Sequence, residues 1–402
     1  MTIKIDKSLA SGKVKAPPSK SMAHRYLICG ALSENSEIKG VSDSKDMLAT
    51  LGCLNALGAK VEKDGNRIKI GGIDFNKKLN HPVLNCYESG STLRFLIPIC
   101  LLFGQEITLC GSKRLFERSL LVYEQICASQ NIKFKKGADF VTVNGRLSAG
   151  TYTVRGDISS QFISGLMFAL SLLYDDSEII ITDKLESASY LSLTIKALAK
   201  FGVRVRRIDE RTLYIKGNQN YKNSVLSVEG DYSNAAFLDA FNLFSGSVAV
   251  SGLSNNTAQG DSVYKEIFPL LQSGRPTVDL TDCPDLAPIL MAIAAAKNGA
   301  VFTGTSRLRI KESDRGLAMK EELSKFGISC IVEENRIIVK KGRLHTPKSV
   351  LNGHNDHRIV MALSVLLSLT GGEISGAEAV AKSFPEFFEK IIKLGIKVNI
   401  VK

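Results

Sequence analysis

The residues with the clearest chemical content in this 402-residue sequence are lysines and arginines at predicted helix starts. A cation at a helix N-terminus is unfavourable by up to about 1 kcal/mol, because that end already carries partial positive charge. One such cation is ordinarily solvated or paired with a surface carboxylate. A recurrent set indicates instead that helix ends and cationic side chains bind phosphate or carboxylate groups together. The set comprises Lys20, Arg25, Arg94, Arg118, Arg315, Arg358 and Lys382.

Two acidic residues within this pattern are candidates for proton transfer. Asp285 follows Pro284, where a first-turn carboxylate also complements the helix dipole, and Glu312 lies in the KESDR stretch at 311–315. A carboxylate among bound phosphates is repelled by them, so we expect its pKa to be raised towards the working pH. A general acid or base needs such a pKa and typically contributes about 10²–10⁴-fold in rate.

Two further polar stretches allow more than one interpretation. Residues 159–161 (SSQ) open a predicted buried helix, where serine is a common cap, but two hydroxyls and an amide also suit a sugar-like acid. His357, next to Arg358, fits a core or capping histidine better than a proton carrier. Because no Ser-His-Asp elbow, HExxH motif or paired metal-ligand cluster is present, we expect neither a metal nor another cofactor.

Composition and charge favour a soluble enzyme with small acidic ligands. The length predicts two domains, and the 52 basic against 40 acidic residues give a net charge of +12. No basic tail or aromatic-interleaved basic stripe occurs and tryptophan is absent, so we expect no nucleic-acid partner.

Residues 1–7 are typical of a strand rather than a signal peptide, and no apolar stretch approaches the roughly 20 residues of a membrane span. Eight scattered cysteines without a CxxC pair indicate the reducing cytoplasm, and we expect a monomer.

A sixfold repeat organises the chain. An amphipathic helix, a left-handed turn residue and a short alternating strand recur at intervals of roughly 70 residues, with one shorter interval. The turn residues are Gly58, Asn131, Gly202, Gly274, Gly327 and Gly395. Apolar helices, expected to be buried, begin near Ser21, Gly90, Ser160, Ser233, Pro284 and His357. Six units split three and three predict two similar α/β domains, with one crossover near 218–223.

At these residues the sequence resembles the enolpyruvyl transferase family, and within it the 5-enolpyruvylshikimate-3-phosphate synthases, along nearly the whole chain. Six short motifs stand in the family's order: 20–25 (KSMAHR), 90–94 (GSTLR), 159–161 (SSQ), 311–315 (KESDR), 355–358 (NDHR) and 382–385 (KSFP). The resemblance implies an α/β fold of two domains, each of three βαβαββ repeats in an inside-out, barrel-like arrangement, with the active site in the interdomain cleft. We place the shikimate-3-phosphate-binding domain at 14–223 and the second domain at 1–13 and 224–402, joined by two crossovers.

The resemblance also implies the reaction and the roles of residues. The enolpyruvyl group of phosphoenolpyruvate would pass to the 5-hydroxyl of shikimate 3-phosphate through a tetrahedral intermediate, with release of phosphate, in aromatic amino acid biosynthesis. Asp285 would be the base, and Glu312, assisted by Lys20, would protonate the methylene carbon. Shikimate 3-phosphate would be bound by Lys20, Ser21, Arg25, Ser159, Ser160, Gln161, Ser187, Tyr190, Asp285 and Lys311. Phosphoenolpyruvate would be bound by Lys20, Gly90, Arg94, Arg118, Gln161, Arg315, His357, Arg358 and Lys382.

The sequence departs from the family's pattern at four places. Glu88 and Arg307 stand where asparagine is usual, Ser119 replaces a proline, and residues 188–189 (Ala-Ser) replace an Arg/Lys-Pro pair. These departures bear on affinity and fine geometry rather than on the reaction class.

Two other functions compete with this interpretation. A UDP-N-acetylglucosamine enolpyruvyl transferase typically carries a cysteine acid in a loop before the arginine, but residues 111–118 (GSKRLFER) contain none. A non-catalytic anion- or RNA-binding protein of the related cyclase-like fold needs no acid and base, so the presence of Asp285 and Glu312 disfavours it.

Overall fold

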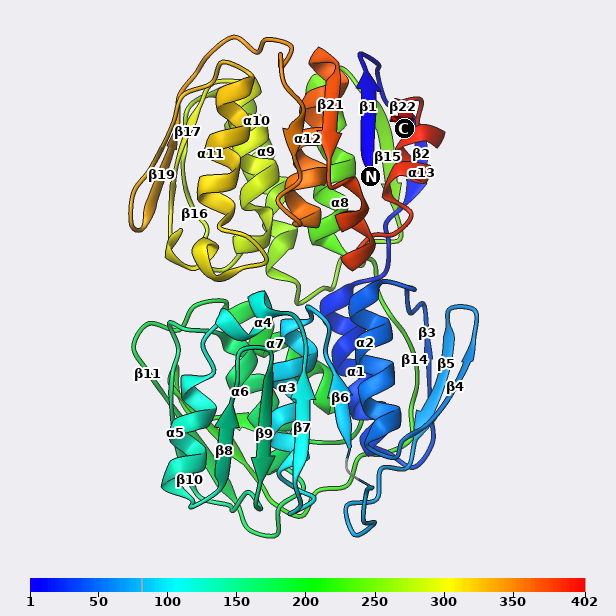
Figure 1. Ribbon diagram of the computed structural model, residues 1–402, viewed down its shortest axis with the longest axis vertical. Helices are drawn as coiled ribbons and strands as arrows, with labels where there is room; N and C mark the ends of the chain where they lie inside the picture. The colour runs from blue at the N-terminus through cyan, green and yellow to red at the C-terminus, as the bar shows by residue number, and fades with distance from the viewer. Residues whose placement is uncertain (81, 402) are drawn as a thin grey trace. The chain divides into compact units, whose positions relative to one another are not determined.

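The computed structural model describes residues 1–80 and 82–401, and the chain divides into two compact units (Figure 1). Unit 1 comprises Met1–Pro17 and Gly230–Lys402, and unit 2 comprises Pro18–Glu229. The expected domain bounds differ from these by a few residues, for reasons of strand pairing. Strand β2 (Ser11–Lys15) contains residue 14 but pairs in parallel with β15 (Ser247–Ser251) of unit 1. Strand β14 (Val225–Ser227) pairs in parallel with β3 (Ser36–Lys39) of unit 2, so the chain leaves unit 2 after Glu229 and not near 218–223.

One strand order recurs in five four-stranded sheets of the described chain. The first strand pairs in parallel with the second, and the third pairs antiparallel with both the second and the fourth. In unit 2 the sheets are β14-β3-β5-β4, β6-β7-β9-β8 and β10-β11-β13-β12. Their remaining strands are β4 (Lys60–Asp64), β5 (Arg67–Gly71), β6 (Val83–Asn85), β7 (Ile107–Cys110), β8 (Lys133–Lys136), β9 (Phe140–Asn144), β10 (Thr151–Arg155), β11 (Ser177–Thr182), β12 (Val205–Arg207) and β13 (Thr212–Ile215).

Unit 1 contains the other two sheets of this order, β16-β17-β19-β18 and β20-β21-β1-β22. Strand β1 (Thr2–Asp6) confirms the expected N-terminal strand and pairs antiparallel with β21 and with β22 near the other end of the chain. The other strands are β16 (Thr277–Asp279), β17 (Ala300–Thr303), β18 (Cys330–Val332), β19 (Arg336–Val339), β20 (Leu351–Asn352), β21 (Gly372–Ser375) and β22 (Lys397–Val401).

One of the six repeats, the fourth along the chain, is incomplete. Its incompleteness explains the short interval after Gly274 in the sequence. Its sheet is only the parallel pair β15-β2, and α9 (Tyr264–Ser273) is followed directly by β16 of the next sheet. Five of the six predicted turn residues have positive φ, from 55° at Asn131 to 97° at Gly395. The prediction is wrong at Gly274, whose φ of −164° is extended. No hairpin has to return at Gly274, so no left-handed turn is needed there.

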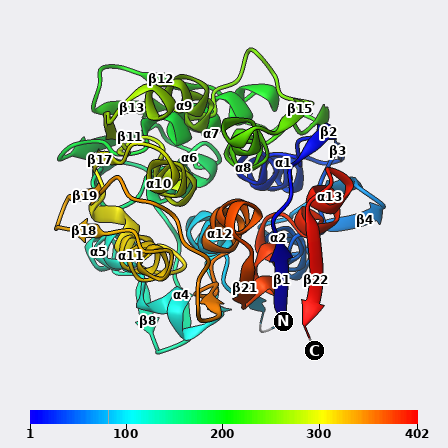
Figure 2. The ribbon, with the colours of Figure 1, turned by 90° about the horizontal axis from the view of Figure 1, so that it is seen from above.

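The helices predicted to be buried form the interior of each unit. They are α1 (Lys20–Leu32), α3 (Gly90–Cys100) and α6 (Ser160–Leu170) in unit 2, and α8 (Tyr232–Asp239), α10 (Ala287–Ala296) and α12 (His357–Thr370) in unit 1. Helix α3 packs on α6, and α12 packs on both α8 and α10. Within unit 1, Figure 2 shows these helices inside and the sheets outside. A helix that is apolar on all sides requires such surroundings.

The remaining helices complete the repeats. They are α2 (Lys45–Ala56), α4 (Lys113–Glu117), α5 (Leu121–Ser129), α7 (Ala188–Lys200), α11 (Arg315–Lys325) and α13 (Phe387–Lys393), with 3₁₀ helices η1 (Ala240–Phe244), η2 (Gly260–Val263), η3 (Pro284–Leu286), η4 (Ser306–Ile310) and η5 (Ala377–Lys382). None of the helices in the described chain combines the length and apolar character needed to span a membrane.

Candidate active site

Asp285 is the centre of a cluster of cations in unit 1. Its Oδ1 accepts from Arg315 Nη1 at 2.7 Å and from Lys311 Nζ at 3.3 Å, and its Oδ2 accepts from Arg358 Nη2 at 2.8 Å. Asp285 lies in the single turn η3, immediately before the buried helix α10. Its side chain is 17% exposed, whereas that of Arg315 is 1% exposed. The structure therefore brings together three of the predicted anion ligands and the predicted base.

Arg315 also holds the predicted acid. Its Nη2 donates to Glu312 Oε2 at 2.8 Å, and its Nε donates to Asp356 Oδ2 at 2.9 Å. Asp356 is fully buried, caps the backbone of Arg358 at 2.9 Å and also accepts from the Ser313 hydroxyl at 3.1 Å. A planar guanidinium with five N–H donors is suited to hold three carboxylates in fixed positions. Arg315 thus places Asp285 and Glu312 on one guanidinium.

The protein's own side chains lower the pKa of Asp285, whereas the raised pKa that we expect depends on bound phosphates. Burial raises it, but the charges of Arg358, Lys311 and Arg315 together hold the pKa of Asp285 well below its ordinary value. The sequence showed Arg315 and Arg358 at predicted helix starts, but not that they contact this one carboxylate together with Lys311. An opposite charge within hydrogen-bonding distance favours the ionised form.

Lys311 lies beside Asp285, and Arg307 adds positive charge near Lys311. Burial, opposed by Asp285 and reinforced by Arg307 and Arg315, lowers the pKa of Lys311 to about 8. Arg307, in η4, is only 8% exposed. Replacement of the usual asparagine by Arg307 therefore places one more buried cation near Lys311.

Of two further predicted phosphoenolpyruvate ligands, Lys382 is placed differently from our expectation, whereas His357 begins the last buried helix as predicted. Lys382 is the last residue of η5 rather than the residue before a helix, and its Nζ donates to the Asn355 carbonyl at 2.5 Å. His357, 1% exposed, is the first residue of α12, with its Nδ1 3.9 Å from Asp356 Oδ1. The Lys382 ammonium therefore reaches the turn that precedes α12, and His357 lies next to Arg358 at the start of that helix.

In unit 2 the predicted ligands Arg94 and Gln161 form one hydrogen-bonded group. Arg94 Nη1 donates to Gln161 Oε1 at 2.8 Å, and Gln161 Nε2 donates to Ser91 Oγ at 2.9 Å. Ser159 caps α6 by accepting from the Gln161 backbone, and the adjacent Ser160 is 3% exposed. The packing of α3 on α6 brings these residues together, although about 70 residues separate them in the chain.

Arg118 does not open a helix, contrary to our prediction. It follows α4 with extended φ and ψ of −71° and 130°, and α5 begins only at Leu121. Its guanidinium lies against Gly90, where a Cβ would be 2.7 Å from Arg118 Nη1. A side chain at position 90 would displace the Arg118 guanidinium, which lies here beside the N-terminus of α3.

The remaining substrate ligands predicted in unit 2 surround Arg25 and Lys20. Arg25 donates to the carbonyls of Ser21 at 2.7 Å and Tyr190 at 3.1 Å, and burial lowers the pKa of Arg25 to about 10. Ser187, 2% exposed, precedes α7 in a left-handed conformation with φ of 58°. Lys20 opens α1, and its Nζ pairs with Asp46 Oδ2 at 2.8 Å.

Sequence reasoning missed several partners of the predicted residues. Asp46 pairs with Lys20, and the Ser233 hydroxyl accepts from Arg358 Nη1. Asp261, 6% exposed in η2, is electrostatically coupled to both Asp285 and Arg358. Ser233 had a weak signal as the start of a predicted buried helix, but Asp261 lies in a loop-like stretch without a distinguishing pattern.

Two of the departures from the family pattern have local explanations. The Ser119 carbonyl accepts from Arg94 Nη2 at 3.3 Å, and this backbone interaction does not depend on the side chain at position 119. Residues 188–189 form the first turn of α7. Nothing in the structure explains Glu88.

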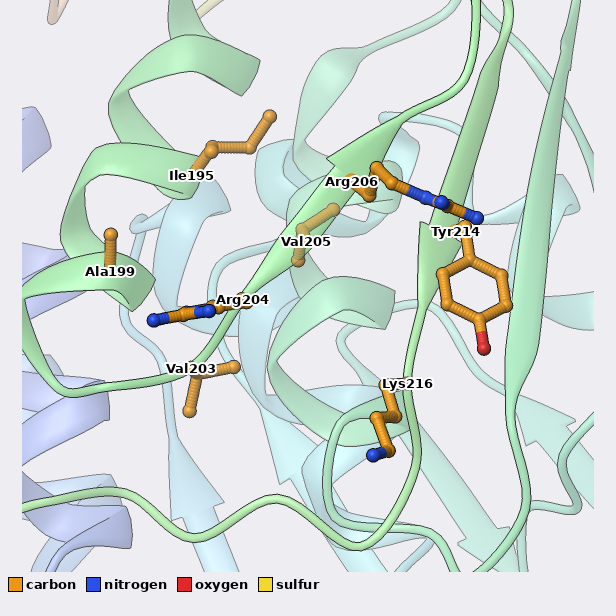
Figure 3. A pocket seen from close by; sticks show the side chains of 8 residues that line it. All are labelled: Ile195, Ala199, Val203, Arg204, Val205, Arg206, Tyr214 and Lys216. Atoms are coloured by element: carbon orange, nitrogen blue, oxygen red, sulfur yellow. The ribbon is translucent and has the colours of Figure 1, made fainter.

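A carboxylate cluster and a groove lie outside the predicted site. Glu321, Glu322 and His354 place oxygen and nitrogen atoms within 4.8 Å of one another, but Lys325 Nζ already donates to the buried Glu322 at 2.8 Å. That ammonium competes with any metal ion. A groove of about 570 Å³ lies in unit 2, and none of the predicted site residues lines it. Figure 3 shows the side chains around this groove. Its lining residues are Ile195, Ala199, Val203, Arg204, Val205, Arg206, Tyr214 and Lys216.

Comparison with known proteins identifies the family to which the chain is similar. The family described as EPSP synthase (3-phosphoshikimate 1-carboxyvinyltransferase) matches residues 5–391. A 3-phosphoshikimate 1-carboxyvinyltransferase of Clostridium kluyveri is 40% identical, over 99% of this chain and 98% of the relative. One of Clostridioides difficile is 38% identical, over 99% and 98%.

The comparison of structures supports the same fold. An EPSP synthase structure from Acinetobacter baumannii superposes with a TM-score of 0.80 at 22% identity, with all of both chains covered. It confirms the predicted α/β enolpyruvyl transferase fold, with two units built from repeats. From its match over almost its whole length, the chain belongs to the EPSP synthase (3-phosphoshikimate 1-carboxyvinyltransferase) family.

Proposed function

We propose that this chain transfers the enolpyruvyl group of phosphoenolpyruvate to the 5-hydroxyl of shikimate 3-phosphate and releases phosphate, in the shikimate pathway of aromatic amino acid biosynthesis. Family membership supports the reaction class. The single observation that supports it chemically is the contact of Arg315 with both Asp285 and Glu312, with Arg358 and Lys311 on the same Asp285 carboxylate. A base and an acid held on a guanidinium suit a reaction between two anions, in which proton transfers have to accompany charge neutralisation.

The proposed reaction proceeds by addition and elimination. Asp285 takes the proton of the 5-hydroxyl as that oxygen bonds to C2 of phosphoenolpyruvate, and Glu312, assisted by Lys20, donates a proton to the methylene carbon. Return of a proton from the new methyl group to Glu312 then accompanies cleavage of the bond to phosphate, and Asp285 passes the hydroxyl proton to the departing phosphate, which restores the base. The product is the enol ether.

The two substrates are proposed to use residues of both units. Shikimate 3-phosphate is bound by Lys20, Ser21, Arg25, Ser159, Ser160, Gln161, Ser187, Tyr190, Asp285 and Lys311. Phosphoenolpyruvate is bound by Lys20, Gly90, Arg94, Arg118, Gln161, Arg315, His357, Arg358 and Lys382. Packing of α3 on α6 and of α10 on α12, which holds Arg94 beside Gln161 and Arg358 beside Asp285, supports this assignment.

A substrate anion is also proposed to activate Asp285. Arg315 and Arg358, which lower the pKa of Asp285, are also proposed ligands of phosphoenolpyruvate. An anion bound by these arginines adds negative charge beside the carboxylate and competes for the same N–H donors. Its arrival therefore raises the pKa of Asp285 and makes it a stronger base.

Phosphate release tests the proposed function directly. The protein with phosphoenolpyruvate is expected to release inorganic phosphate when shikimate 3-phosphate is added, and not when UDP-N-acetylglucosamine is added. The reverse preference would assign the chain to the other enolpyruvyl transferase reaction. No release with either acceptor, in a protein shown to be folded, would contradict the proposal.

Lys311 gives the proposed substrate binding a pH dependence. Because its pKa is about 8, its ammonium is charged below that pH and neutral above it, so the affinity for shikimate 3-phosphate should fall as pH rises through about 8. Calorimetric titration from about pH 6.5 to 9.5 measures this effect. Lys311→Met should bind more weakly at low pH and show a flatter profile. An unchanged wild-type affinity across the range would contradict the role of Lys311.

We also propose a monomeric, cytoplasmic enzyme that acts on these two small molecules, with neither a nucleic acid nor a membrane partner. The free thiols of all eight cysteines support a reducing location. Light scattering of the purified protein tests the monomer, for which the expected mass is that of one 43.7 kDa chain.

A further inference from the structure

Arg358 connects Asp285 to a second buried carboxyl group in unit 1. Its guanidinium donates to Asp285 Oδ2 at 2.8 Å and, through Nη1, to the Ser233 hydroxyl. Ser233 in turn is hydrogen-bonded to the carboxyl group of Asp261. The four side chains come from η2, α8, η3 and α12, so this connection exists only in the folded unit.

The turn that carries Asp261 is fixed to the start of α8. The Gln259 side chain, 6% exposed, accepts from the Tyr232 backbone at 3.0 Å and donates to the Gly230 carbonyl at 2.9 Å. Asp231 caps the same helix by accepting from the Asn234 backbone at 2.8 Å. Asp261 therefore has a defined position relative to Ser233, and its burial is costly unless the carboxyl group is compensated.

We propose that Asp261 is a positioning residue for the transfer reaction, which holds Arg358 through Ser233 and strengthens Asp285 as the base. This inference rests on the proposed function. A negative charge on Asp261 disfavours a second negative charge on Asp285 and so increases the proton affinity of Asp285. Asp261 also fixes the Ser233 hydroxyl as a second acceptor for the Arg358 guanidinium. Because Arg358 is shared between Ser233 and Asp285, it neutralises the Asp285 carboxylate less strongly.

The charge state of Asp261 should change near neutral pH. Burial, together with the negative charges of Asp285 and Asp231, raises the pKa of Asp261 to about 7, opposed by Arg358 and the Ser233 hydrogen bond. The Cys283 thiol is a further titratable group that interacts with Asp261, and burial raises the pKa of that thiol far above neutrality. Asp261 is thus protonated at low pH, where Asp285 is the weaker base, and ionised above about pH 7.

The test compares Asp261→Asn with Asp239→Asn. Asp239, the last residue of α8, is a partly buried carboxyl group that accepts from the Tyr264 hydroxyl, so its variant controls for the loss of a carboxylate from the interior of unit 1. In phosphate-release assays, Asp261→Asn should lower kcat about tenfold with little change in KM for phosphoenolpyruvate, and should remove an ionisation near pH 7 from the kcat/KM profile. Asp239→Asn should retain that ionisation. Ser233→Ala should also retain it, with a reduced kcat, because Asp261 is still present but no longer linked to Arg358.

Two outcomes would overturn the inference. One is full kcat in Asp261→Asn with the ionisation near pH 7 intact. The other is a loss of thermal stability in Asp261→Asn in which kcat and KM change by the same factor and the pH profile stays that of the wild type. That result would indicate a purely structural role for Asp261. Titration of ¹³C-aspartate carboxyl signals gives a readout that does not need turnover. A signal that titrates near pH 7 and disappears in Asp261→Asn would assign that ionisation to Asp261 independently of the proposed reaction, and a midpoint below about pH 5 would contradict the inference.

Discussion

Asp285→Ala is expected to lower kcat by at least about 10³-fold while anion binding remains measurable. The variant removes the proposed base, and a general base typically contributes about 10²–10⁴-fold. Lys311, Arg315 and Arg358 remain, and they lose the carboxylate that occupies them in the wild type. Affinity for phosphoenolpyruvate should therefore be retained or increased, which single-turnover assays and calorimetry can separate from the loss in rate.

Asp285→Asn and Asp282→Asn refine this experiment. Asp285→Asn keeps the shape of the side chain but not the base, so its activity should be nearly as low as that of Asp285→Ala. Asp282 is an exposed aspartate three residues earlier, and its variant should keep wild-type activity. Substantial turnover in either Asp285 variant would exclude Asp285 as the base.

Arg315→Met is expected to reduce the free energy of unfolding by about 3–5 kcal/mol and to abolish turnover. Arg315 is 1% exposed and contacts three carboxylates, of Asp285, Glu312 and Asp356. Removal of one partner from a buried ion cluster leaves the others uncompensated, and the cost of such a change is typically of this size. The neutral side chain also leaves Asp285 and Glu312 without the group that holds both of them. Urea denaturation measures the loss of stability.

Arg315→Lys and Arg336→Met are the matched controls. Lysine keeps the charge but lacks the planar fork, so Arg315→Lys should recover part of the stability and little of the rate. Arg336, 50% exposed and 4.0 Å from Glu333, forms an exposed pair, and its loss should cost less than about 1 kcal/mol. Wild-type stability in Arg315→Met would contradict the central role of this arginine in the cluster.

Local patterns in the sequence predicted the repeats, and short motifs carried the family resemblance that implied the reaction class. A helix that is apolar on all sides has to be buried, and a glycine or asparagine after a helix has to permit a left-handed turn, so both features can be recognised without knowledge of the fold. Five of the six predicted turns follow this rule, and α12 and its counterparts are buried as expected. The motifs that contain Asp285, Glu312 and Arg315 likewise depend on residue order, and the family match bears out the reaction class that they indicated.

The tertiary structure decided which of these residues are neighbours, and with that their charge states. The pKa of Asp285 is lowered because side chains 26, 30 and 73 residues away converge on it, and no local pattern records such distances. Asp261 was missed for the same reason, because its effect comes from contact with Ser233 and from charges on other helices. The extended Gly274 and the place of β14 in unit 2 depend on which strands pair, and strand pairing is a property of the folded chain. A sequence specifies which groups are present, whereas Coulomb energies and hydrogen bonds depend on distances that folding alone sets.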